Sequence, residues 1–196
     1  MATSKPTNIV YIKNMVCNRC IKVVKEELEN LGVRIIKISL GEVETELPAG
    51  KLPMKKIAAV LEENGFELLE DKKAKLVERI KNFLIKIIYE EEKAISETHK
   101  FSGLIEKELG FDYNYLSQLF SSLESITIEQ FIILEKIERA KELLKYGELT
   151  LSEIAYKLGY SSVQHLSSQF KKVTGFTASE FKSLAANLRK PLDKVK

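Results

Sequence analysis

The sequence is poor in several residue types: among its 196 residues are two cysteines, four prolines and no tryptophan. Two cysteines are too few for a disulfide scaffold. No apolar run approaches the roughly 20 residues that span a bilayer. The opening stretch, MATSKPTNIVYI, also lacks an apolar core long enough for a signal peptide. We therefore expect a cytoplasmic protein that has no membrane partner.

The sequence does not indicate an enzyme, because it shows no P-loop, no clustered carboxylates and no plausible pair of nucleophile and base. Its composition is that of an ordinary globular protein, 44% hydrophobic and 30% charged, and its length suits two small domains. The net charge of +3 is unevenly distributed. Residues 147–196 carry eight Lys or Arg against four Asp or Glu, whereas residues 101–146 carry five against eight. A polyanion partner is therefore expected at the C-terminal end.

Residues 1–71 are expected to form one domain with the order strand, helix, strand, strand, helix, strand. The strands alternate apolar and polar residues or are rich in β-branched residues, and the helices have apolar residues at helical spacing. This β-α-β-β-α-β order is typical of a ferredoxin-like domain, so the expected fold class is α+β. The six segments are TNIVYIKN, CIKVVKEELENL, VRIIKISL, VETEL, PMKKIAAVLEEN and FELLE.

Residues 72–100 are expected to form a linker, most of it one amphipathic helix over about 72–93. Its apolar face must be buried against something. The face can dock within the chain, or it can pair with a second copy of itself, because positions 76, 80, 83 and 87 have coiled-coil-like spacing. A homodimer through the face at 76–88 is therefore one of two open alternatives. The apolar residues of this face are Leu76, Val77, Ile80, Phe83, Leu84, Ile87 and Ile88.

Residues 101–196 are expected to form an all-α domain that contains an internal repeat. IEKELGF (105–111) matches IAYKLGY (154–160), and YLSQLF (115–120) matches HLSSQF (165–170). Each unit reads as helix, Gly turn, helix. Between them, the stretch from Thr127 to Leu144 reads as one long helix that opens with a capping box to Gln130. About 18 residues span roughly 27 Å, which is close to the roughly 34 Å between successive major-groove faces of a duplex.

The sequence thus predicts two helix-turn-helix units that bind double-stranded DNA, each with a reading helix that presents polar residues outward. In the second unit, both Thr150 with Glu153 and Ser161 with Gln164 have capping-box spacing, which indicates two helix starts. Gln suits adenine and Lys neutralises phosphate. The first unit has no cation from Phe111 to Ser125, so the second is expected to supply most of the electrostatic affinity. The candidate DNA-binding residues are Asn114, Ser117, Gln118 and Ser121 in the first unit, with Leu116, Leu119, Phe120 and Leu123 facing inward, and Ser161, Gln164, His165, Ser168, Lys171 and Lys172 in the second.

Residues 101–184 resemble the C-terminal DNA-binding domain of the AraC-type transcription regulators. The segments that carry the resemblance are YLSQLF, KIERAKELL, LSEIAYKLGY, HLSSQFKKVTG and FTASEFK. The resemblance implies transcription regulation, usually as a dimer. Two residues depart from the family pattern: Glu106 stands where a small residue is usual, as Ala155 does in the second unit, and Ala178 stands where a proline is usual.

Both cysteines lie in NMVCNRC (14–20), between a predicted strand and a predicted helix. This context places Cys17 on a loop and Cys20 on the first helical turn, where two thiolates can converge on one ion. The helix N-terminus and Arg19 lower the thiol pKa. Two soft sulfur ligands without a third favour Cu(I), whereas Zn(II) normally takes four ligands. Zn(II) and other thiophilic ions stay open, since a dimer could supply four cysteines.

Residues 7–71 resemble the heavy-metal-associated domain of metallochaperones and metal-pumping ATPases, through the order of elements and the motif Met15-x-Cys17-x-x-Cys20. In that family both cysteines bind metal and the methionine packs under the loop. Asn14 and Val16 depart from the usual residues. The whole chain is thus predicted to be a DNA-binding regulator that senses a thiophilic metal. Open alternatives are a thiol redox sensor, a structural cysteine pair, a sensor of a protein or another ligand, and a metal carrier.

Overall fold

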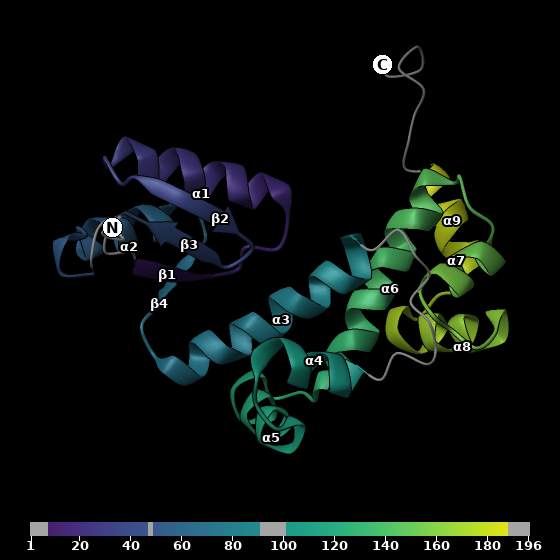
Figure 1. The fold of residues 1–196 in the computed structure, drawn as a ribbon. Coiled ribbons are helices and arrows are strands. Elements are labelled where there is room, and N and C mark those ends of the chain that lie inside the picture. The colour runs from purple at the N-terminus through teal and green to yellow at the C-terminus, as the bar shows by residue number, and fades with distance from the viewer. Residues whose placement is uncertain (1–7, 47–48, 91–100, 188–196) are drawn as a thin grey trace, which may run out of the picture. The chain divides into compact units, whose positions relative to one another are not determined.

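The computed structural model describes residues 8–46, 49–90 and 101–187 (Figure 1). The chain divides into two compact units, residues 1–83 and 84–196. The only sheet in the described residues belongs to the first unit, and the second is helical. The expected linker beyond Glu90 and the last residues of the expected C-terminal domain, 188–196, lie outside the described residues.

The first unit is built on a four-stranded antiparallel sheet with the strand order β2-β3-β1-β4. Val10 of β1 lies opposite Val43 of β3, and Tyr11 lies opposite Leu69 of β4. The order of strands and helices agrees with the order expected from the sequence. The elements are β1 (Asn8–Lys13), α1 (Asn18–Asn30), β2 (Ile35–Ser39), β3 (Glu42–Thr45), a short 3-10 helix (Ala49–Lys51), α2 (Met54–Glu63) and β4 (Glu67–Leu69).

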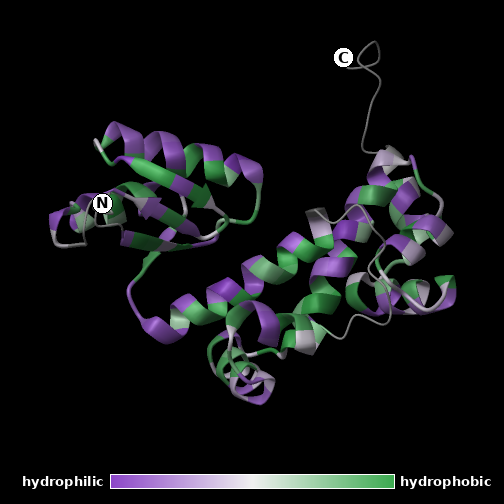
Figure 2. Cartoon of the chain, in the orientation of Figure 1, coloured by the Kyte–Doolittle hydropathy of each residue, from purple (hydrophilic) through white to green (hydrophobic). Residues whose placement is uncertain are grey.

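The core of this unit lies between the sheet and helices α1 and α2. Val10 and Ile12 of β1 are buried, whereas Ile9 is 44% exposed, as expected for the alternation of a strand. Figure 2 shows hydrophobic and hydrophilic residues interleaved along α1, which buries its apolar residues against the sheet. The helix residues that complete the core are Val24, Leu28, Ile57 and Leu61.

Helix α3 (Lys72–Glu90) crosses the boundary between the two units. Its expected apolar face is buried within this single chain except for Phe83, which is half-buried. These side chains therefore do not need a second copy for their burial, which favours docking within the chain. A homodimer stays a prediction. In the described residues, no helix combines the length and hydropathy needed to cross a bilayer.

In residues 101–187 the second unit has six further helices, and the 19-residue helix α6 lies between two small cores. Phe131, in the N-terminal half of α6, packs on Phe120 of α5 with ring centroids 5.6 Å apart. The C-terminal half, from Ile137 to Leu144, joins the core of α7, α8 and α9. Figure 1 shows α6 lying between these groups of helices. The helices are α4 (Phe101–Leu109), α5 (Tyr113–Glu124), α6 (Ile128–Tyr146), α7 (Leu151–Lys157), α8 (Val163–Thr174) and α9 (Ala178–Asn187).

The ends of these helices agree with the sequence at two of three capping boxes. Thr127 and Gln130 cap each other reciprocally at α6, and Thr150 and Glu153 do the same at α7. The capping box expected between Ser161 and Gln164 is wrong, because α8 starts one residue later. Its N-cap is Ser162, whose hydroxyl accepts from the His165 N–H at 3.1 Å.

Candidate nucleic-acid interface and cysteine loop

Helix α8 presents a polar face that is held in place by a small core. Leu166 and Phe170 are fully buried, and Phe170 packs edge-to-face on Phe181 of α9 with centroids 5.6 Å apart. Because these two residues face inward, the opposite side of the helix faces solvent. All six residues expected to touch DNA in this unit are exposed: Ser161, Gln164, His165, Ser168, Lys171 and Lys172.

His165 is the most constrained side chain of this face. Its Nδ1 lies 3.1 Å from the Ser161 hydroxyl, and its ring stands perpendicular to the Tyr160 ring at 5.2 Å between centroids. Burial raises the pKa of Tyr160 to about 12, so this phenol is neutral at physiological pH. Since Nδ1 is engaged, a contact from the imidazole to a base or a phosphate would use Nε2.

Helix α5 occupies the same place in the first unit and exposes a different surface. Asn114 and Gln118 are exposed, whereas Ser117 and Ser121 are half-buried. Leu116, Leu119 and Phe120 face inward as expected. Leu123 does not: it lies in the last turn of the helix and is 50% exposed.

The start of α5 is held by acidic side chains. Asp112 is its N-cap and accepts from the Tyr115 N–H at 3.2 Å. Glu106 of α4 accepts from the Tyr113 N–H at 2.8 Å. The Tyr113 hydroxyl donates in turn to the Glu129 carboxylate, a hydrogen bond that is the main cause holding the pKa of Glu129 below its usual value. This contact of Glu106 was not predicted, although Glu106 already departs from the pattern of the family and of the second unit, where Ala155 stands.

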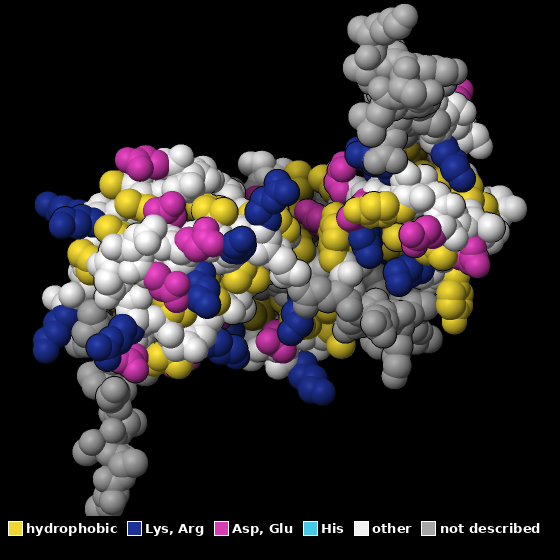
Figure 3. All heavy atoms as spheres, turned by 90° about the horizontal axis from the view of Figure 1, so that it is seen from above, with side chains coloured by type: hydrophobic (Ala, Val, Ile, Leu, Met, Phe, Trp, Pro, Cys, Tyr) yellow, Lys and Arg dark blue, Asp and Glu magenta, His cyan; other side chains and the backbone are white. Residues whose placement is uncertain are grey.

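The charge of the two units follows the same contrast. Residues 101–126 hold one Lys against four acidic residues, whereas residues 150–175 hold three Lys against one Glu. In residues 1–83, by comparison, Figure 3 shows basic and acidic side chains interspersed on the visible face of this N-terminal part. Attraction to a polyanion is therefore concentrated at the second helix-turn-helix unit.

The cysteine loop lies between β1 and α1, where the sequence places it. Cys17 is the exposed N-cap of α1, Cys20 lies in the first turn, and their sulfurs are 3.4 Å apart. The pKa of the Cys17 thiol lies below its ordinary value, chiefly because the backbone amide of Cys20 favours the thiolate. Met15 is fully buried in the core beneath.

Two sulfur ligands that face each other fit a soft ion of low coordination number. Within the described ranges, no group of three or more His, Cys, Asp or Glu side chains is placed to hold a metal. A four-coordinate ion such as Zn(II) would therefore need ligands beyond this pair.

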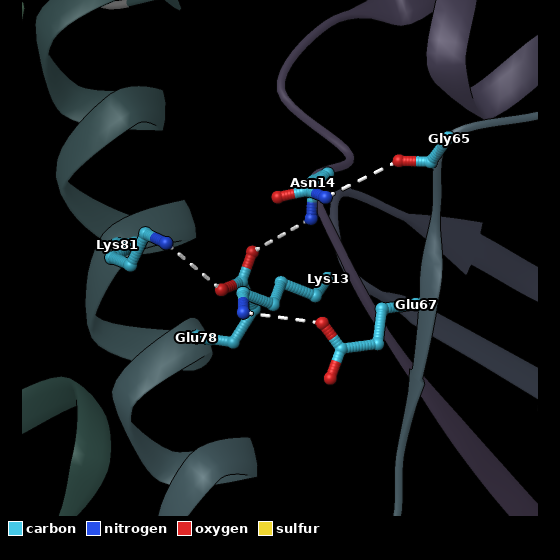
Figure 4. A network of polar contacts seen from close by, with 6 residues as sticks. All are labelled: Lys13, Asn14, Gly65, Glu67, Glu78 and Lys81. Atoms are coloured by element: carbon cyan, nitrogen blue, oxygen red, sulfur yellow. Dashed lines mark hydrogen bonds and ion pairs between the residues drawn. The ribbon is translucent and has the colours of Figure 1, made fainter. Parts of the chain in front are cut away.

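The loop is tied to helix α3 by a buried carboxylate (Figure 4). Asn14, whose φ is +70°, donates its backbone N–H to Oε1 of Glu78 at 3.3 Å and its side-chain amide to the Gly65 carbonyl at 3.2 Å. Glu78 is 4% exposed, and its other oxygen pairs with Lys81 at 3.2 Å. Asn tolerates this left-handed backbone better than most residues, so the departure from the usual residue is compatible with the turn.

Comparison with known proteins finds similarity in the C-terminal helices. Residues 105–183, from α4 to α9, match the model of a helix-turn-helix domain. The xylose operon regulatory protein of Haemophilus influenzae is 42% identical over 67 residues, which cover 34% of this chain and 17% of that protein. The Msm operon regulatory protein of Streptococcus mutans is 25% identical over 155 residues, which cover 79% of this chain and 54% of that protein.

A solved structure, the C-terminal domain of AraT, a response regulator from Geobacillus stearothermophilus, is 21% identical with a TM-score of 0.49, covering 64% of this chain and 95% of that one. The chain spans about half the length, or less, of the curated relatives named above. Residues 105–183 are a helix-turn-helix DNA-binding domain. That this domain is of the AraC type, as the resemblance of residues 101–184 implies, stays a prediction. The two relatives are regulatory proteins, in agreement with the expectation that the chain is not an enzyme.

Proposed function

We propose that the chain is a sequence-specific DNA-binding transcription regulator. The observation that carries this proposal is the α8 surface, where six exposed polar or basic residues lie opposite the buried Leu166 and Phe170. Helix α6 has 19 residues and so spans about 28 Å, which suits two units that enter successive turns of one major groove, roughly 34 Å apart. The regulatory names of the relatives support the same function.

The test is selection of DNA by the full chain from a pool of duplexes with a randomised centre. The proposal expects recovery of a shared sequence motif, with binding that weakens steeply as salt rises. Recovery of unrelated sequences, or binding that does not depend on salt, would contradict it. A homodimer and a cytoplasmic location stay predictions, and gel filtration with and without DNA tests the first.

For the N-terminal unit we propose a ferredoxin-like sensory domain of the heavy-metal-associated kind, in which Cys17 and Cys20 hold a thiophilic ion, Cu(I) before Zn(II). The order β-α-β-β-α-β, the 3.4 Å between the two sulfurs and the lowered pKa of Cys17 support this role. Binding of the ion would change the conformation of the cysteine loop, and Glu78 of α3 accepts a hydrogen bond from that loop.

Metal binding is tested on the reduced full chain and its Cys17→Ser and Cys20→Ser variants. One Cu(I) per chain is expected for the wild type, and each variant should lose it, because a single thiolate is left. If reduced wild type binds no thiophilic ion below micromolar concentration, metal sensing fails. The alternatives are then a redox pair, a protein or other ligand, or a structural pair.

The reactivity of Cys17 separates these alternatives further. Its lowered pKa means that thiolate forms at lower pH in the folded chain than in the unfolded chain. The Cys20 thiol also lowers the pKa of Cys17, although less than the Cys20 backbone amide does. Alkylation is therefore measured on the wild type, by mass spectrometry of peptides, so that both contributions are present. Cys17 should react faster at pH 7 in folded than in denatured protein. Slower reaction would rule out a thiolate suited to metal or redox chemistry.

A further inference from the structure

The two helix-turn-helix units differ at one position in the helix that precedes the reading helix. Ala155 of α7 is buried in the core of the second unit. The corresponding residue of α4, 49 positions earlier, is Glu106. Its carboxylate lies 2.8 Å from the backbone nitrogen of Tyr113, the first residue of α5. A small core residue in one unit is therefore replaced in the other by an acid that caps the reading helix.

This acid is one of three carboxylates around the first turn of α5. Asp112 accepts from the Tyr115 N–H, and Glu129 accepts from the Tyr113 hydroxyl. The start of a helix carries a partial positive charge that attracts anions. At α5 this charge is already matched by carboxylates of the protein itself, and their excess negative charge repels phosphate.

The exposed residues of α5 that remain are neutral. Asn114 and Gln118 can each make a pair of hydrogen bonds to the major-groove edge of adenine. Tyr115 is 45% exposed, with its ring 5.9 Å from the Phe111 ring, and such an apolar surface suits the thymine methyl group. Helix α8 instead carries Lys171 and Lys172 in its last turn.

We propose that Glu106 makes α5 a discriminating reader of A·T base pairs, one that selects sequence through Gln118 and Asn114 and adds almost no sequence-independent affinity. This inference rests on the proposed function, because it assumes that both units meet DNA. In this proposal helix α8 supplies most of the salt-dependent affinity, and α5 determines the DNA sequences at which the protein stays bound.

The first experiment repeats the selection from randomised duplexes with the full chain and with two matched variants, Gln118→Ala and Gln164→Ala. The positions whose base preference is lost only in Gln118→Ala mark the part of the site that α5 reads. These positions should be A·T pairs in the wild-type motif. Gln118→Ala should weaken binding to the selected site on the order of tenfold, because a bidentate base contact is lost, and should leave binding to unrelated DNA unchanged.

The second experiment isolates the charge of Glu106. Glu106→Gln keeps an oxygen that can accept from the Tyr113 N–H but removes the negative charge, whereas Glu106→Ala removes both. Glu106→Gln should raise affinity for unrelated DNA by roughly two- to threefold and should lower the ratio of specific to unrelated binding. Thermal unfolding by circular dichroism distinguishes this effect from a loss of the cap, which only Glu106→Ala should show.

Several outcomes separate the two levels of the proposal. If no motif is recovered by the wild type, the proposed function itself fails. If a motif is recovered but G·C pairs occupy the positions assigned to α5, the inference fails alone. It also fails if Gln118→Ala weakens binding equally on selected and unrelated DNA, or if Glu106→Gln leaves binding to unrelated DNA unchanged.

Discussion

The two helix-turn-helix units have similar cores and different surfaces. Phe120 and Phe170 hold the same place in the repeat, both are fully buried, and each has an aromatic neighbour 5.6 Å from its ring centroid. Leu116 and Leu166 are likewise buried in both. Core positions of a repeat are constrained by packing, whereas exposed positions are free to diverge. The divergence here gives one unit an acidic start and the other a basic end.

The largest expected effect tests whether the two cores are equivalent. Phe120→Ala and Phe170→Ala should each lower the free energy of unfolding by about 3–5 kcal/mol, because each removes a large side chain from a closed core. Urea unfolding followed by circular dichroism measures the loss, with hydrogen exchange to locate it. Tyr156→Ala is the control, since Tyr156 is 75% exposed and should change the stability by less than about 0.5 kcal/mol. A loss of the size of this control at either phenylalanine would break the equivalence.

The second effect tests the basic end of α8. Replacing Lys171 and Lys172 together by alanine should weaken binding to every duplex and reduce the salt slope by about 1.8, since each phosphate contact contributes about 0.9. Fluorescence anisotropy at several salt concentrations measures this slope. Lys107→Ala, at an exposed position of α4, is the matched control and should leave the slope nearly unchanged. An equal change of the salt slope in both variants would mean that both helix-turn-helix units contribute to phosphate binding.

The third effect concerns the two capping boxes. Thr127→Ala and Thr150→Ala should each destabilise the chain by about 1 kcal/mol, because each helix loses the oxygen that accepts from its N3 amide. Serine at either position keeps that oxygen and should restore most of the stability. Thermal unfolding of the four variants measures the difference. An alanine variant as stable as its serine counterpart would show that the cap contributes little at that helix.

The smallest effect depends on pH and separates the two boxes. Gln130 is neutral, whereas the pKa of Glu153 lies below its usual value, chiefly because it accepts from the Thr150 backbone N–H. A carboxylate with a lowered pKa in the folded state stabilises the fold above its ordinary pKa, and this contribution is lost as the pH falls through the folded pKa. Between pH 7 and pH 3, the melting temperature of the wild type should thus fall slightly more than that of Glu153→Gln. A larger loss in Glu153→Gln would contradict this sign.

Much of this architecture could be predicted from sequence because it depends on local signals. The capping boxes at Thr127 and Thr150, the repeat and the apolar periodicity of α8 all lie within a few residues of the chain. The order of elements in the N-terminal unit follows from alternation and turn residues. The exposed set of α8 followed from turning the helix so that Leu166 and Phe170 face inward.

What could not be predicted depends on contacts between segments far apart in the chain. Glu106 reaches a backbone amide seven residues away across a turn, so its role appears only once α4 and α5 are packed. The bond from Asn14 to Glu78 joins residues 64 positions apart. The choice of Ser162 over Ser161 as N-cap is a matter of one residue, and adjacent serines offer the same chemistry.

The most direct measurement of the central claim is a hydroxyl-radical footprint of the full chain on a DNA sequence that it has selected. Two units on a helix about 28 Å long should protect two stretches of the duplex, on one face and about one helical turn apart. Glu106→Gln should strengthen protection on the side where Gln118→Ala weakens it. A single protected stretch, or two stretches on opposite faces of the duplex, would contradict the account.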